Sequence, residues 1–154
     1  MFQSRGNKFT WLGHSALRIT TASGKVILVD PRILSNPMCP DALKAFERIG
    51  TMLVSHGHFD HIGDAVELAK KHSPQVVGIH ETCAWLESKG VKNIAPMNKG
   101  GTQKVGEIEV TMVHAIHSCG ITDGDQIIYG GEACGYIAHF ATSPAISRVS
   151  KSTS

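Results

Sequence analysis

Short apolar runs and helical patterns alternate along the middle of the chain. The run at 26–29 is apolar at every position, which is typical of a strand buried on both faces of a sheet. Ile62, Ala65, Val66 and Ala69 follow the i, i+3, i+4, i+7 spacing of one helix face. Such alternation with short links indicates an α/β layer with mixed or parallel pairing. The predicted strands are 9–12, 16–20, 26–29, 51–55, 75–79 and 93–97, and the predicted helices are 41–49, 62–72 and 81–89.

The pattern changes after residue 100. Residues 102–105 and 108–113 flank Gly106 and Glu107, which indicates a β-hairpin. An Asp-Gly-Asp turn is predicted at 123–125, and further strands are predicted at 127–129 and 135–140. The proline-containing segment 31–40 is predicted to be a loop. We expect one domain over 1–140 and a Ser/Thr-rich tail over 141–154 that is disordered or loosely attached.

Metal-binding side chains are concentrated between the strand at 51–55 and the helix at 62–72. Three imidazoles and a carboxylate occur there within six residues, at His56, His58, Asp60 and His61. Neutral imidazole suits zinc, iron and nickel, whereas a carboxylate suits harder cations. His56 and His58 are two residues apart, so in extended backbone both side chains lie on one face and can reach one ion. Gly57 is expected to let the backbone bend tightly between them.

Asp60 and His61 follow where the chain turns into the helix, so they point beside the first pair rather than onto it. The sequence therefore predicts two adjacent sites, with His56 and His58 at one ion and Asp60 and His61 at its neighbour. A lone His-x-His occurs by chance on surface strands, and a single buried histidine is more often a hydrogen-bonded core residue. Four candidate ligands in six positions at a strand end favour a metal site.

Other histidines are weaker candidates. His14 either lines the pocket, if the first hairpin folds over it, or is a hydrogen-bonded turn residue. His72 is expected to be a cation at a helix C-terminus, and His80 a structural residue at a helix start. The residues alone leave His117 undecided between ligand and ordinary residue. His114 would face the opposite side of an extended chain from His117 and is the weaker candidate.

Composition limits the class of protein. At 154 residues, with 42% apolar and 18% charged residues, the chain is expected to be one soluble globular domain. A formal charge of +2 without a basic patch does not favour nucleic acid, and no apolar run reaches the roughly eighteen residues of a membrane span. Four cysteines without a Cys-x-x-Cys pair and an N-terminus without an apolar signal segment favour a cytoplasmic location. Cys119 is either a soft metal ligand or, as we favour, a small core residue.

Five motifs occur in a specific order over about residues 8–138. They are WLGHS (11–15), VILVDP (26–31), VSHGHFDHIGD (54–64), PMNKGG (96–101) and AIHS (115–118). Together they resemble the metallo-β-lactamase superfamily, and within it the uncharacterised metal-dependent hydrolases related to the ascorbate-6-phosphate lactonase group. The resemblance implies an α/β (α+β) fold of the αββα sandwich type. It also implies that His117 is the third ligand of the His56–His58 ion and that Asp30 is a structural carboxylate under the metal loop, although spacing alone is equally consistent with an ordinary strand-end Asp30.

The resemblance breaks near the C-terminus. Family members continue to a Gly-Asp-Thr whose Asp bridges the two metals, and then to a last His at the second ion; no Gly-Asp-Thr occurs here. We therefore expect only the N-terminal half to two-thirds of the sandwich, as a truncation or an altered reading frame would give. Asp60 and His61 are then expected to hold the second ion weakly. Apolar surface left uncovered favours a homo-oligomer.

The expected function is metal-dependent hydrolysis of a small molecule. One or two zinc ions, with manganese or iron as alternatives, would make water reactive toward an ester, lactone or phosphoester bond. The resemblance implies that Asp60 is the catalytic residue that holds or deprotonates this water. The alternative is a non-catalytic metal-binding or interaction fragment. A metal ligand at Asp123 or Asp125 is a minor alternative.

Overall fold

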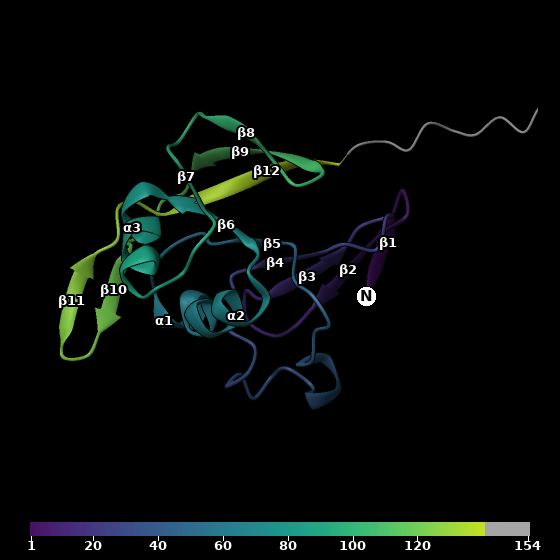
Figure 1. The fold of residues 1–154 in the computed structure, drawn as a ribbon, viewed down its shortest axis with the longest axis horizontal. Coiled ribbons are helices and arrows are strands. Elements are labelled where there is room, and N and C mark those ends of the chain that lie inside the picture. The colour runs from purple at the N-terminus through teal and green to yellow at the C-terminus, as the bar shows by residue number, and fades with distance from the viewer. Residues whose placement is uncertain (141–154) are drawn as a thin grey trace, which may run out of the picture.

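Two β-sheets pack face to face, and helices cover the outer face of the larger sheet (Figure 1). The structure is a computed structural model that describes residues 1–140. The tail expected at 141–154 lies outside the described residues. The expected mixed α/β fold is confirmed, with three layers in the order helices, larger sheet and smaller sheet.

The larger sheet contains seven strands that lie in chain order. Its first four strands pair antiparallel, and the later strands continue from β4 in parallel. Because the carboxyl ends of the parallel strands meet at one edge, the loops that follow them gather there, where α/β proteins bind ligands. The strands are β1 (Phe2–Ser4), β2 (Asn7–Trp11), β3 (Leu17–Thr20), β4 (Val26–Val29), β5 (Thr51–Leu53), β6 (Gln75–Ile79) and β7 (Ile94–Met97).

The parallel strands are buried on both faces, as the apolar run at 26–29 predicts. Leu28 and Met52 belong to the core shared with the helices. Ile27 and Leu53, their immediate neighbours in sequence, belong to the core between the two sheets. Because side chains alternate along a strand, a continuous apolar run supplies both cores at once.

Three α-helices follow β5 and β6: α1 (Phe59–Ile62), α2 (Ala65–His72) and α3 (His80–Ser88). The helix predicted at 62–72 therefore begins earlier and is interrupted at Gly63 and Asp64. The Asp64 carboxylate accepts the N–H groups of Ile33 and Leu34, which anchors the start of α2 to the loop after β4. None of the helices within residues 1–140 has the length and apolar character needed to span a membrane.

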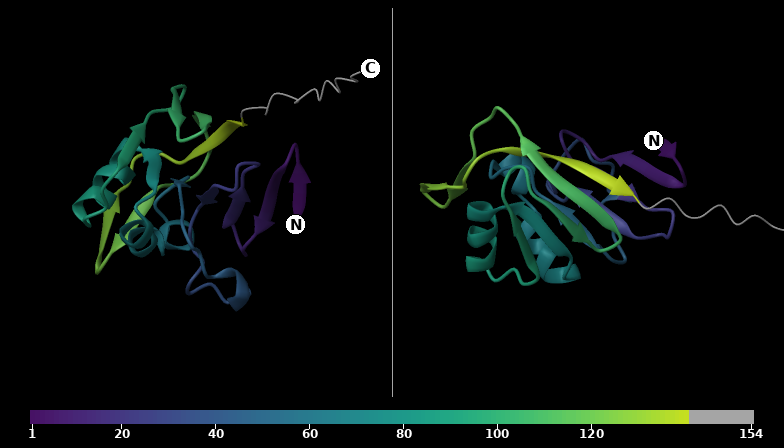
Figure 2. Two further views of the ribbon diagram at one scale, coloured as in Figure 1. Left: turned by 45° about the vertical axis from the view of Figure 1, so that its right-hand side comes forward. Right: turned by 90° about the horizontal axis from the view of Figure 1, so that it is seen from above.

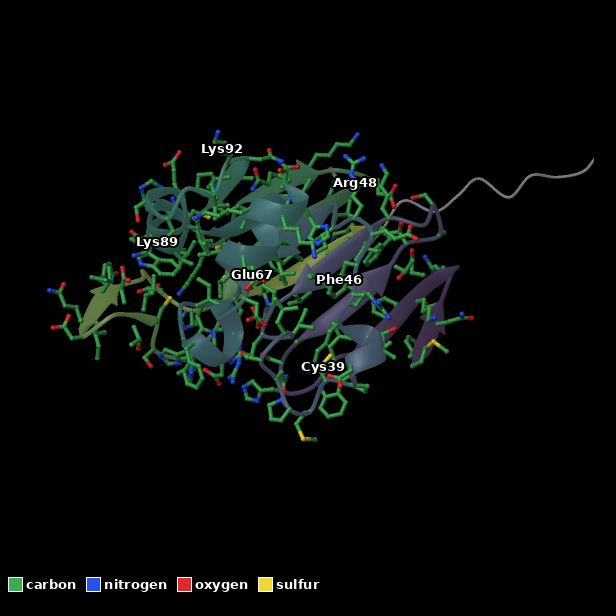
Figure 3. The ribbon with its side chains drawn as sticks, turned by 60° about the horizontal axis from the view of Figure 1, so that its bottom comes forward. Cys39, Phe46, Arg48, Glu67, Lys89 and Lys92 are labelled. Atoms are coloured by element: carbon green, nitrogen blue, oxygen red, sulfur yellow. The ribbon has the colours of Figure 1, made fainter. Side chains whose placement is uncertain are left out.

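The helix predicted at 41–49 is wrong, because only a 3-10 turn forms there, η1 (Asp41–Leu43). Phe46, which is labelled in Figure 3, is instead held by contacts of its side chain. Its ring centroid lies 6.4 Å from that of His72 and 5.7 Å from the guanidinium carbon of Arg18. Ile49 is fully buried in the same core. A helix this short is marginal in water, so the packing of single apolar side chains decides the path of this segment.

The smaller sheet has the strand order β12-β9-β8, and in Figure 2 its long strands cross over the larger sheet. Its strands are β8 (Thr102–Val105), β9 (Ile108–His114) and β12 (Cys134–Phe140), so the predicted hairpin is confirmed. A separate hairpin, β10 (Gly120–Asp123) with β11 (Gln126–Tyr129), projects from one end of the molecule (Figure 1). Sequence patterning predicts β11 and its Asp-Gly-Asp turn but misses β1 and β10, which are short, with β1 exposed throughout and β10 only partly buried.

Candidate metal centre

The histidine-rich loop lies at the carboxyl edge of the parallel strands, between β5 and α1. Ser55, directly after β5, donates its backbone N–H to Asp30 Oδ1 at 2.7 Å and its hydroxyl to Asp30 Oδ2 at 2.7 Å. The carbonyl of Ser55 accepts the N–H of Cys134 at the start of β12. His58 precedes α1, and its carbonyl accepts the N–H groups of the first helical turn. Both ends of the loop are therefore fixed by hydrogen bonds.

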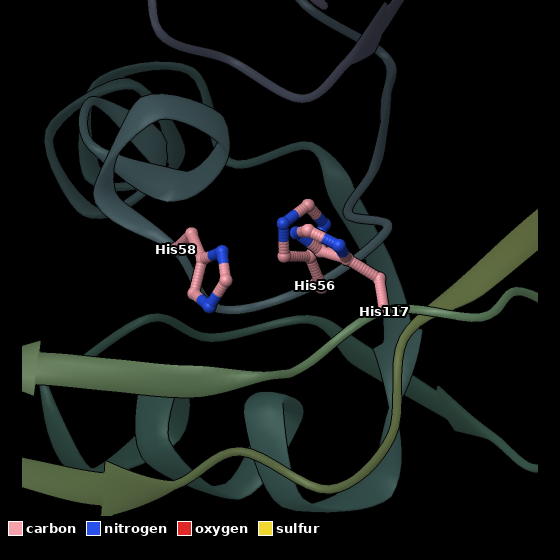
Figure 4. Close-up of side chains that lie close together, drawn as sticks. All are labelled: His56, His58 and His117. Atoms are coloured by element: carbon pink, nitrogen blue, oxygen red, sulfur yellow. The ribbon is translucent and has the colours of Figure 1, made fainter.

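One ring nitrogen from each of His56, His58 and His117 lies within 4.8 Å of the other two. The His56 ring centroid is 4.7 Å from those of both His58 and His117, and the last two are 5.0 Å apart. Figure 4 shows the three side chains converging, with His117 entering from the segment after β9. We call these residues the first cluster.

His56 has the donor geometry of a cation ligand. Its side chain is almost fully buried, with the residue 5% exposed, and its Nε2 has no hydrogen-bond partner. Burial and the nearby His61 lower the pKa of His56 to about 4, so the ring is neutral at pH 7. The Ser55 hydroxyl donates to Asp30 and must therefore accept the Nδ1–H of His56, which lies 2.9 Å away. This network assigns the lone pair to Nε2, and a buried unpaired acceptor of this kind fits a divalent cation.

A second cluster consists of His14, Asp60 and His61, whose candidate ligand atoms also lie within 4.8 Å of one another. The two clusters adjoin, because the His56 and His61 ring centroids are 3.9 Å apart. Burial alone would raise the pKa of Asp60, but a hydrogen bond from its own backbone N–H and the adjacent His61 and His14 lower it below the usual value. Asp60 is therefore an ionised carboxylate at neutral pH.

Asp30 supports both clusters from below the loop. Besides the two hydrogen bonds from Ser55, its Oδ2 lies 2.8 Å from His61 Nδ1, which therefore carries the proton and leaves Nε2 free. Asp30 is 5% exposed and adopts a left-handed backbone conformation with φ of 47°. The expectation of a structural carboxylate under the loop thus agrees with these contacts. One buried carboxylate sets the ring tautomer of His56 through Ser55 and that of His61 directly.

Gly57 is required for a different reason from the one expected. Its φ does not lie in the left-handed region. A Cβ at Gly57 would lie only 2.3 Å from Ile121 Cγ1. The backbone N–H of Gly57 donates to Cys119 Sγ at 3.3 Å. Cys119 is buried and its thiol donates to the Gly130 carbonyl, as the core interpretation expects. The loop therefore packs directly against β10, without room for a side chain.

The structure brings together all five residues predicted from the sequence as metal ligands, in two adjacent groups. His14, for which sequence reasoning left two alternatives, lies in the second group. His114 lies outside both groups and contacts Lys99 Nζ at 2.8 Å. His72 lies in the last turn of α2, where burial and the nearby Lys71 lower its pKa. His80 is exposed at the start of α3.

Asp123, a minor ligand candidate in the sequence, is engaged by Trp85 Nε1 and Lys89 Nζ, away from both groups. Two residues near the clusters escape sequence reasoning. Ser55 and Ser118 were not expected to take part, yet the Ser118 hydroxyl lies 3.2 Å from His58 Nε2. Their positions beside histidines in sequence are the only signal that could have indicated such a role. A serine next to a ligand is too common to be predictive.

The helices, the larger sheet and the smaller sheet correspond to three of the four layers of the αββα sandwich that the resemblance implies, with the histidine-rich loop at the carboxyl edge of the larger sheet. The solved structure of a metallo hydrolase from the archaeon Ignicoccus hospitalis superposes with a TM-score of 0.72 and 30% identity, covering 87% of this chain and 56% of that one. The chain belongs to the β-lactamase superfamily, because the profile of the Beta-lactamase superfamily domain matches residues 25–146.

Relatives are similar over most of this chain but are longer. A metal-dependent hydrolase from Koribacter versatilis is 64% identical over 136 residues, covering 88% of this chain and 58% of the relative. The chain thus spans a little over half of that relative's length. A diiron β-hydroxylase from Streptomyces venezuelae shares the fold at a TM-score of 0.66 and 19% identity, covering 88% of this chain and 28% of that one.

Proposed function

We propose that this chain is a metal-dependent hydrolase in which the first cluster holds a divalent cation. The observation that carries the proposal is the buried Nε2 of His56, which has no hydrogen-bond partner. Its lone pair lies close to the imidazoles of His58 and His117. The name of the Koribacter relative and the archaeal metallo hydrolase fold support the same activity. Three imidazoles with an open coordination position are typical of hydrolytic zinc sites.

In this proposal His56, His58 and His117 hold the first cation, and Asp60 and His61 contribute to a second. Zinc is the proposed metal, with manganese or iron as alternatives, because imidazole and carboxylate donors suit all three. When bound, such a cation lowers the pKa of water and polarises the bond to be cleaved.

The roles of the residues follow from their environments. His56 is neutral and oriented by Ser55, so it needs no rearrangement to donate its lone pair. Ser118 donates to or accepts from the His58 ring and restricts its rotation. Asp60 is ionised and partly exposed beside the first cluster, so its carboxylate can orient the attacking water and accept its proton. We propose a small-molecule substrate with an ester, lactone or phosphoester bond.

The test is a metal-binding and turnover experiment on chelator-stripped protein. We expect close to one equivalent of Zn²⁺ or Mn²⁺ at the first cluster and metal-dependent turnover in a panel of esters, lactones and phosphodiesters. His58→Ala should abolish binding of the first equivalent and the turnover, whereas His139→Ala, which changes an exposed histidine on β12 outside both clusters, should change neither. Absence of bound metal would refute the proposal, and bound metal without turnover would favour a non-catalytic metal-binding fragment.

We also propose a cytoplasmic homo-oligomer. Large apolar side chains are exposed on β11 and β12, including Ile127, Tyr129 and Ile137, and such surface favours association. Size-exclusion chromatography with light scattering should give a mass of at least two chains. A monomer at micromolar concentration would contradict this.

A further inference from the structure

We propose that His14 is the third ligand of a second cation site, which it forms with Asp60 and His61. This inference rests on the proposed function, because the second site adjoins the first. It goes beyond it by assigning a role to a residue in the turn between β2 and β3, far from the histidine-rich loop in sequence. It also makes the second site stronger than the two-ligand site that the sequence implies.

The contact between His14 and Asp60 is direct. His14 Nε2 lies 2.8 Å from Asp60 Oδ2, and His61 Nε2 lies 3.7 Å from the same oxygen. The rings of His14 and His61 are 5.2 Å apart and nearly perpendicular. Each of the three residues thus offers one candidate ligand atom within 4.8 Å of those of the other two. This donor set of two imidazoles and a carboxylate suits zinc, manganese and iron.

The orientation and exposure of the ligands agree with cation binding. His61 donates its Nδ1–H to Asp30, so its Nε2 presents a lone pair toward Asp60. Exposed fractions of the side chains fall from 53% for His14 to 34% for Asp60 and 16% for His61. The site therefore opens to solvent on the His14 side, where a cation can enter.

The turn that carries His14 is rigid. Two backbone hydrogen bonds close it, because the Leu12 N–H donates to the Ala16 carbonyl and the Ala16 N–H donates to the Gly13 carbonyl. Trp11 Nε1 donates to the His14 carbonyl at 2.7 Å. His14 has a φ of 50°, a left-handed conformation that few residues other than glycine adopt, although histidine does so more readily than most. The ring is thus held over Asp60 by the fold rather than by a flexible loop.

Gly13 explains why the turn approaches so closely. Its φ is 100°, and a Cβ there would lie 2.8 Å from Met38 Cβ and 2.9 Å from Asn36 Nδ2. The turn therefore packs against the loop after β4, whose first residues hold Asp64 and the start of α2. The same loop thus links the positions of His14 and of the helices that follow the metal loop.

The opposing explanation is that His14 and Asp60 form only a surface ion pair. Metal stoichiometry separates the two, because an ion pair does not change the number of cations bound. We would titrate Co²⁺ into chelator-stripped protein, follow the visible absorption bands, and measure bound metal by elemental analysis after gel filtration. We expect two equivalents for the wild-type chain.

The key variant is His14→Asn, because asparagine also tolerates a left-handed backbone and so removes the ring without straining the turn. We expect it to lose the second equivalent, with at least a tenfold weaker second dissociation constant, and to keep the first equivalent and its absorption bands. His117→Ala should lose the first equivalent and keep the second. His139→Ala should bind both, and circular dichroism should show that each variant is folded.

The outcomes are distinguishable. If the wild-type chain binds no cation, the proposed function fails together with this inference. If it binds two and His14→Asn also binds two with unchanged affinities, only the role of His14 is overturned. If it binds one and His14→Asn binds one, the second site does not form and the inference is overturned while the proposed function remains.

Discussion

Replacement of Gly57 by alanine tests whether the metal loop is held against β10 by close packing. The new Cβ would lie 2.3 Å from Ile121 Cγ1 and 3.3 Å from its Cδ1. Carbon atoms pack best at about 3.5–4.0 Å, so the overlap exceeds roughly 1 Å. Ile121 is 1% exposed, so its side chain is surrounded by other residues of the core. Overpacking of a core costs about 1–3 kcal/mol, which outweighs the roughly 0.4–1 kcal/mol that alanine gains by restricting the unfolded chain.

The cleanest measurement is a double-mutant cycle by urea unfolding in the presence of a chelator. Ile121→Ala removes the opposing carbon and by itself should cost about 2–5 kcal/mol through the cavity left behind. In the double variant the new methyl group occupies part of that cavity. We therefore expect a favourable coupling energy between the two substitutions of about 0.5–3 kcal/mol.

Gly50→Ala is the matched control. Gly50 is exposed before β5, and a Cβ there would meet its nearest atom, the Val26 carbonyl oxygen, at an ordinary 3.5 Å. The free energy of unfolding of the Gly50→Ala variant should differ little from that of the wild-type chain. If Gly57→Ala and Ile121→Ala were additive within about 0.5 kcal/mol, the packing argument would be refuted. Cation affinity offers a second readout, because displacement of His56 and His58 should weaken the first site.

Two further predictions concern buried groups. Asp30→Asn keeps the left-handed backbone but replaces one acceptor oxygen with a donor NH₂ group beside Ser55 and His61. The substitution should therefore lower the free energy of unfolding by about 1–3 kcal/mol and weaken cation binding about 10–100-fold. A variant as stable as the wild-type chain in the presence of chelator would contradict this. Burial raises the pKa of the Cys83 thiol from 9.0 to about 12 and that of Cys134 to about 11. The folded state then keeps protons that the unfolded chain releases, so stability should be complete below pH 9 and should fall between pH 9 and about 12. Urea unfolding under reducing conditions would show this, and a free energy of unfolding that stays constant from pH 8.5 to 10.5 would be inconsistent with it.

Local patterns account for much of what could be predicted. The run at 26–29 indicates a strand that supplies two cores, because the alternation of side chains along a strand is a local property. The pairing of His56 with His58, and of Asp60 with His61, is likewise a matter of spacing within six residues. The helix predicted at 41–49 fails because its pattern is weak and tertiary contacts of Phe46 prevail.

Contacts between distant segments could not be derived from spacing. His117 joins His56 because β9 pairs within a second sheet that packs on the first, and only the family resemblance indicated that convergence. His14 meets Asp60 because the turn between β2 and β3 packs on the loop after β4. The need for glycine at position 57 depends on Ile121, which lies more than sixty residues away.

The sequence by itself therefore determined the kind of donor atoms, the loop that carries most of them and the buried strands that hold this loop. The tertiary structure decided which of the remaining histidines complete each cluster, and which buried carboxylate orients them. The physical reason is that ligand chemistry and strand periodicity are encoded in neighbouring residues. The shared position of two side chains from distant segments depends instead on sheet order, register and packing.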